Sequence, residues 1–211
     1  MLASLIVLIA AGCSAAAPPA PAAADVIAPA RKDAAVRAAE IPLNGAGGYE
    51  WSAFAGFGIN QVINGSAAGI DIGTAGVRVS RLWGEQFGSF LRGHPAVALE
   101  LVPLMAFVRD GGNTLAVGTN LVYEHHFAAR GRVLPVWQIG AGFLYADDPV
   151  PDGETQHNFS VLTGLGVEVL LGNRSAVSIG YRFHHVSNAN TGNVNPGVNA
   201  HSVILGVSFY R

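Results

Sequence analysis

Apolar side chains fall on every second position from Tyr49 to the end of the chain, in segments separated by turn-forming residues. A period of two is typical of β-strands with one apolar face, whereas a helical face repeats about every 3.6 residues. A slip in the alternation near Gly76 predicts a β-bulge. The pattern predicts eight strands, at 49–60, 69–83, 94–108, 114–126, 134–145, 156–171, 175–187 and 201–210.

The face opposite the apolar one consists mainly of Gly, Ser and Ala, with single charges at Glu100, Glu124, Glu168 and Arg182. Such a face is too small and too sparsely charged for a solvated exterior, and it suits the lumen of a narrow barrel whose apolar wall meets lipid. We therefore predict an all-β fold, an eight-stranded antiparallel outer-membrane β-barrel in a Gram-negative cell. Because isolated buried charges are costly, Arg182 should contact at least one of the carboxylates. A soluble, lipocalin-like lipid-binding barrel is the alternative.

Composition agrees with a membrane setting. Only 12% of the residues are charged, about half of the roughly 25% in ordinary soluble domains. The formal net charge of -2 offers no basic surface for nucleic acid. A single cysteine excludes an internal disulfide framework.

The first 48 residues show no strand pattern. We expect a signal peptide or lipoprotein signal over 1–24, a linker over 25–48 and the barrel over 49–211. Residues 9–13 resemble a lipobox, in which Cys13 is acylated; cleavage after Ala24 is the alternative.

Two polar residues, His185 and Ser187, continue the lipid-facing row of the seventh predicted strand. A histidine base beside a serine hydroxyl is the minimum arrangement that activates a serine nucleophile. The structural alternative is a polar pair that hydrates the rim of the barrel. His201 shares this parity and is a rival base, whereas His184 has the opposite parity and should lie in the lumen near Arg182.

Other clusters of polar residues give weaker indications of a metal site. The spacing of His125 and His126 does not match a zinc motif. An acidic outer loop either binds a divalent cation together with lipid phosphates or is simply solvated. We expect no metal and no cofactor. The acidic residues of the loop are Asp147, Asp148, Asp152 and Glu154.

The stretch from Tyr181 to Ala189, continued by Asn195–Asn199, resembles the C-terminal signature R-x-x-H-x-S-N-A followed by N-P-G of the lipid A 3-O-deacylase family (PagL-like acyloxyacyl hydrolases). Residues 135–142 and 158–166 are also similar to this family. The resemblance implies an eight-stranded outer-membrane barrel with its active site on the lipid-facing wall. It further implies a serine esterase that removes the 3-O acyl chain of lipid A in lipopolysaccharide.

By this resemblance, Ser187 is the nucleophile, His185 its base and Asn188 part of the oxyanion hole. Where the family has a glutamate, this chain has Asn199. An asparagine orients the imidazole through its carbonyl oxygen but supplies no charge, so activity is expected to be reduced or altered. The rival interpretation is a structural outer-membrane barrel without catalysis.

Overall fold

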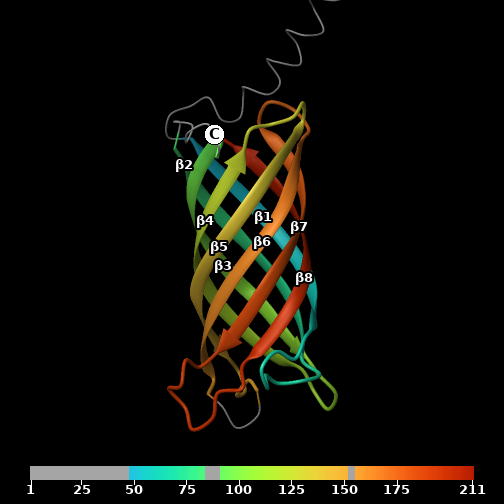
Figure 1. Ribbon diagram of the computed structural model, residues 1–211, viewed down its shortest axis with the longest axis vertical. Helices are drawn as coiled ribbons and strands as arrows, with labels where there is room; N and C mark the ends of the chain where they lie inside the picture. Colours follow the sequence, from blue (N-terminus) through green and yellow to red (C-terminus); the bar gives the residue numbers. More distant parts are fainter. Residues whose placement is uncertain (1–47, 84–90, 152–154) are drawn as a thin grey trace, which may run out of the picture.

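The computed structural model describes residues 48–83, 91–151 and 155–211, which form a closed antiparallel barrel (Figure 1). Each strand pairs with its neighbours in chain order, and β1 closes the barrel by pairing with β8. The predicted fold class is therefore confirmed. The strands are β1 (Tyr49–Asn60), β2 (Asp71–Leu82), β3 (Gly93–Val108), β4 (Thr114–Phe127), β5 (Val133–Ala146), β6 (His157–Leu170), β7 (Ser175–Ser187) and β8 (Val198–Tyr210).

Alternation along the strands separates two faces, as predicted. Large apolar residues such as Leu121 and Leu165 are 62% and 61% exposed on the outer wall, whereas Arg182 in the lumen is 1% exposed. An apolar exterior around a polar interior is the arrangement that a lipid environment requires. Separately, the described residues include no helix with the length and hydrophobicity needed to cross a membrane.

One irregularity shifts the register. The pairing of β2 with β3 changes register between Ala75 and Val77, close to the predicted bulge, but burial alternates without a break along β2, so the predicted slip in β2 itself is absent. The extra residue lies in β3, where Pro103 and Leu104 are both exposed. A Cβ on Gly76 would lie 2.6 Å from the Phe54 ring and 2.4 Å from the Leu101 carbonyl oxygen, so glycine permits this close approach. The same extra residue of β3 shifts its register with β4 between Val102 and Met105, a position that the sequence pattern missed.

The lumen is filled by a charged network centred on Glu100. Both terminal nitrogens of Arg182 donate to this carboxylate at 3.1 Å, which confirms the predicted contact. Arg78 donates to Glu100 at 2.9 Å and also to Glu124. Both guanidinium groups lie over the ring of Phe54, at 5.5 and 5.4 Å. Arg78 has the inward parity of Ile72, Thr74 and Ser80. The sequence pattern missed it because the apolar residues of β2 change from the inner face at Ile72 to the outer face at Val77.

The barrel places the two ends of β7 far apart. In Figure 1 the C-terminus lies at the upper end, and the arrowhead of β7 and its loop to β8 lie at the lower end. β8 begins at Val198, three residues before the expected start, because Val186 pairs with Val198 and His185 with Asn199. Asn199 is thus held in a strand next to His185, and our placement of it in the outer loop was wrong.

Candidate active site

Three polar side chains form a continuous hydrogen-bonded chain on the outer wall. His185 Nε2 lies 3.1 Å from Ser187 Oγ, and His185 Nδ1 lies 2.7 Å from Asn199 Oδ1. Residues two apart on a strand share a face, which brings His185 to Ser187. Directly opposed residues on paired strands are close as well, which brings Asn199 to His185.

This arrangement selects one protonation pattern of the histidine. Asn199 Oδ1 only accepts, so His185 Nδ1 carries the hydrogen and donates it. The lone pair of Nε2 then faces Ser187, whose hydroxyl donates to it. A neutral imidazole with a free lone pair towards a serine hydroxyl is the form that acts as a general base.

The three residues of this hydrogen-bonded chain, His185, Ser187 and Asn199 (the trio), differ in burial. His185 and Ser187 are half-buried, whereas Asn199 is 5% exposed. His185 and Ser187 are therefore accessible from the outer wall, whereas Asn199 is shielded.

Glycine at position 197 lets the outer loop close over the histidine. Its φ of +63° lies in the left-handed region that favours glycine. A Cβ there would lie 3.0 Å from His185 Cε1 and 3.3 Å from Ser187 Cβ. Gly197 therefore provides both a backbone turn and the space that His185 and Ser187 occupy.

The loop after β1 supports Asn199 from its other side. Gln61 donates its backbone N–H to the Asn199 carbonyl oxygen at 2.9 Å, and Asn60 Nδ2 donates to the same oxygen at 3.0 Å. Asn60 Oδ1 accepts from the backbone of Gly69, so its carboxamide also orders its own loop. Sequence reasoning missed this role, although closure of the barrel between the first and last strands was the available signal.

Asn188 lies on the opposite face from Ser187 and is fully buried. Its Nδ2 donates to the Val194 carbonyl at 2.8 Å, and its Oδ1 accepts from the Asn190 backbone at 2.9 Å. Its backbone N–H donates to Asn195 Oδ1 at 3.2 Å. The side chain thus organises the loop and is not available to a substrate. The contribution of Asn188 to an oxyanion hole stays a prediction, and only its backbone N–H could make it.

The turn after Ser187 has an unusual backbone. Ala189 and Asn190 have φ values of +53° and +63°, a left-handed conformation that non-glycine residues adopt at a cost. The hydrogen bonds around Asn188 hold this turn directly beside Ser187.

The other candidate residues lie apart from the trio. His201 pairs with Phe183, and its Nδ1 lies 2.5 Å from the Tyr181 hydroxyl. His184 is buried in the lumen, as its parity predicted. In the acidic loop, Asp147 Oδ1 accepts from the backbone N–H of Leu115 at 2.8 Å. Asp152 and Glu154 lie outside the described residues, as do Cys13, the predicted signal and all of the predicted linker except Gly48.

Solved outer-membrane barrels share this architecture. The outer membrane enzyme PagL matches with a TM-score of 0.54 and 18% identity, covering 74% of this chain and 97% of that one. Neisserial surface protein A matches with a TM-score of 0.49 and 12% identity, over 78% and 97%. OprG from Pseudomonas aeruginosa matches with 0.48 and 11%, over 81% and 99%. At 18% identity, the PagL structure supports the fold alone.

The sequence comparisons identify the family. No curated protein sequence matches the chain. The family model described as Lipid A 3-O-deacylase (PagL) matches residues 41–208, a span that contains all eight strands apart from the last two residues of β8, together with the trio. The chain therefore belongs to the lipid A 3-O-deacylase (PagL) family of outer-membrane ester hydrolases.

Proposed function

We propose that Ser187, His185 and Asn199 carry out the family's deacylation, with Ser187 as nucleophile, His185 as base and Asn199 as the group that orients the base. The observation that carries this proposal is the hydrogen-bonded chain from Ser187 Oγ through both nitrogens of His185 to Asn199 Oδ1.

The reaction begins with attack of Ser187 Oγ on the carbonyl carbon of the 3-O ester. The hydroxyl proton passes to His185 Nε2, and the tetrahedral intermediate collapses as the bond to the sugar oxygen breaks. His185 returns its proton to that oxygen, which leaves as the free hydroxyl of lipid A. Water, deprotonated by the same nitrogen, then hydrolyses the acyl-enzyme and releases the fatty acid.

Negative charge develops on the carbonyl oxygen during attack and needs hydrogen-bond donors. The backbone N–H of Asn188 directly follows the nucleophile. Its bond to Asn195 Oδ1, at 3.2 Å, is long enough to be exchanged for one to substrate. We assign Asn188 to the oxyanion hole through this N–H group.

The position of the trio suits an acyl chain in the outer leaflet. The outer row of β7 runs through Ile179, Tyr181 and Phe183 before it reaches His185 and Ser187. Acyl chains packed against this wall bring their ester ends to the rim without leaving the membrane. Lipid A of lipopolysaccharide is the substrate partner in this proposal.

Asparagine in place of glutamate sets the electrostatics of the base. Its Oδ1 fixes the histidine tautomer, as in cysteine–histidine–asparagine sites, but adds no negative charge beside the imidazolium formed during attack. We therefore infer an active enzyme in which His185 is well oriented, but in which its protonated form is less stabilised than it would be beside a glutamate.

Mass spectrometry of lipid A from Gram-negative cells tests the proposal. Cells that express the wild-type chain should contain lipid A lacking one 3-hydroxy fatty acid, and cells that express Ser187→Ala should not. Heat-modifiable migration in detergent gels verifies that both barrels are folded. Loss of the acyl chain in cells expressing folded Ser187→Ala would contradict the assignment of the nucleophile.

A further inference from the structure

A second cluster of polar residues lies in the lumen at the end of the barrel remote from Ser187. Glu50 comes from the start of β1, and Glu124 and His126 come from the end of β4. One donor atom of each lies within 4.8 Å of the donors of the other two. All three residues are at most 1% exposed, so the fold buries three potential metal ligands away from solvent.

The cluster contains buried polar atoms without hydrogen-bond partners. Both ring nitrogens of His126 and Oε2 of Glu50 are in this state. Such groups are rare in folded proteins, and each calls for an explanation such as an ion. His126 Nε2 and Glu50 Oε2 are 3.7 Å apart, which is too long for a hydrogen bond. Two ligands at about 2.1 Å from one tetrahedral zinc ion are separated by roughly 3.4 Å, close to the observed spacing.

Charge in the described part of the lumen also favours a cation. Four carboxylates, Glu50, Glu100, Glu124 and Glu168, face two guanidinium groups, Arg78 and Arg182. Both guanidinium groups form ion pairs with Glu100, and Arg78 forms a second ion pair with Glu124. Unpaired charges are costly in a narrow lumen, and a divalent ion would neutralise Glu50, which makes no ion pair with either guanidinium group.

The remaining two carboxylates receive hydrogen bonds from hydroxyl groups only. Ser208 donates to Glu50 Oε1 at 2.7 Å, and Tyr210 donates to Glu168. These bonds leave Glu50 Oε2 available. Glu124 Oε2 accepts from Ser80 at 2.6 Å and, like any carboxylate oxygen, keeps a second lone pair for another partner.

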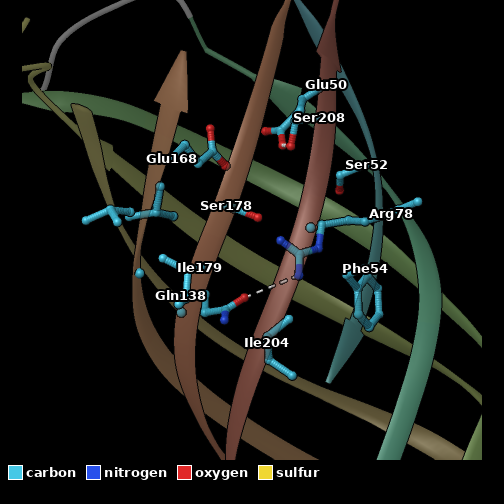
Figure 2. A pocket seen from close by; sticks show the side chains of 16 residues that line it. Glu50, Ser52, Phe54, Arg78, Gln138, Glu168, Ser178, Ile179, Ile204 and Ser208 are labelled. Atoms are coloured by element: carbon cyan, nitrogen blue, oxygen red, sulfur yellow. Dashed lines mark hydrogen bonds between the residues drawn. The ribbon is translucent and has the colours of Figure 1, made fainter. Parts of the chain in front are cut away.

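A cavity of about 50 Å³ lies beside Glu50. Its lining includes Glu50, Glu168 and Ser208 at one end and Arg78 with Gln138 further along, as Figure 2 shows. A water molecule needs roughly 10–15 Å³ of such volume. The cavity therefore has room for water that completes the coordination shell of an ion bound to Glu50.

We propose that Glu50, Glu124 and His126 bind a divalent transition-metal ion of the zinc type, with water as the remaining ligand. An imidazole among carboxylates favours such ions over Mg²⁺ and Ca²⁺, which prefer oxygen ligands alone. The ion links β1 to β4 across the lumen and stabilises the folded barrel. The spacing of His125 and His126 did not predict it, because one ligand comes from a strand more than 70 residues upstream.

Zinc binding to the whole barrel tests the proposal. The full chain, without a histidine tag, is folded in detergent, stripped with chelator and dialysed. Calorimetric titration with Zn²⁺ alone should show one ion per barrel, elemental analysis should give the same ratio, and the unfolding temperature should rise with Zn²⁺ but not with Mg²⁺. No binding to the folded protein would overturn the proposal.

Variants locate the ion. His126→Gln and Glu50→Gln should each weaken zinc binding at least tenfold and abolish the thermal shift. His125→Gln, on the same strand and the opposite face, should retain both. If His126→Gln does not fold, Glu50→Gln carries the test. Undiminished binding in folded Glu50→Gln, or equal loss in His125→Gln, would overturn the assignment. Deacylation should be unchanged in His126→Gln, since this site lies apart from the trio.

Discussion

The outer rim and the lumen of this barrel use polar residues in opposite ways. In the lumen, Arg182 and Glu100 are buried, charged and bonded to several partners each. At the rim, His185 and Ser187 are half-buried and linked through one chain of neutral hydrogen bonds. Internal charges are paired because the narrow lumen demands it. Polar groups on a lipid-facing row have no such structural need, which points to catalysis.

The largest expected effect separates His185 from His201, which lies on the neighbouring strand of the outer wall. His185→Gln should lower the rate of 3-hydroxy fatty acid release from purified lipid A by about 10³-fold or more, because the nucleophile loses its base. His201→Gln is the matched control, since His201 contacts Tyr181 instead of the trio. Both rates are measured in detergent on folded protein. A larger loss in His201→Gln would identify His201 as the base.

In the lumen, Arg182→Met should lower the stability of the barrel and leave the rate of deacylation nearly unchanged. Removing one partner of a buried ion pair costs about 3 kcal/mol or more, and Glu100 would lose two hydrogen bonds of 3.1 Å. Chemical unfolding in detergent measures this loss, and activity per folded barrel should stay within about twofold. The double variant Arg182→Met/Glu100→Gln should recover part of the stability. Unchanged stability in Arg182→Met would show that the network contributes little.

Replacing Asn199 tests how a negative charge beside His185 would change the rate of deacylation. Asn199→Ala should slow deacylation about tenfold, because a neutral hydrogen bond contributes about 1 kcal/mol. Asn199→Glu should speed it about tenfold, since hydrogen bonds to charged groups are worth about 1 kcal/mol more. Rates with purified lipid A measure both. Full activity in Asn199→Ala would show that another group orients His185.

The smallest effect concerns Gly197. Gly197→Ala and Gly65→Ala both place a Cβ at positive φ, +63° and +79°, so each should lose about 1 kcal/mol of stability. Only the Cβ at 197 would touch His185 and Ser187, whereas the one at 65 meets no atom within 4 Å. We therefore expect a severalfold lower rate in Gly197→Ala alone. Equal rates in the two variants would mean that the loop moves aside without disturbing the pair.

The strands and the two faces were predictable from sequence because lipid imposes strict alternation. The pairing of His185 with Ser187 followed from parity, and the roles of the trio came from the family resemblance. Three features could not be found in this way. Arg78 was missed because the apolar residues of β2 change from the inner face at Ile72 to the outer face at Val77. The strand position of Asn199 was obscured by a polar, asparagine-rich segment.

The third feature is the contact of residues from distant strands. Asn60 supports Asn199 only because β1 closes on β8. Glu50 meets His126 across the lumen, where no local spacing reveals their proximity. Alternation states which face a residue occupies, but contacts across a barrel depend on the register of every strand between them.

The most direct test of the central claim is to label the nucleophile. A long-chain phosphonate ester that reacts with activated serines is incubated with the folded barrel in detergent, and the adduct is located by peptide mass spectrometry. The account predicts a single adduct at Ser187, much reduced in His185→Gln and retained in His201→Gln. An adduct at another residue, or unlabelled Ser187 in a barrel that still deacylates lipid A, would contradict it.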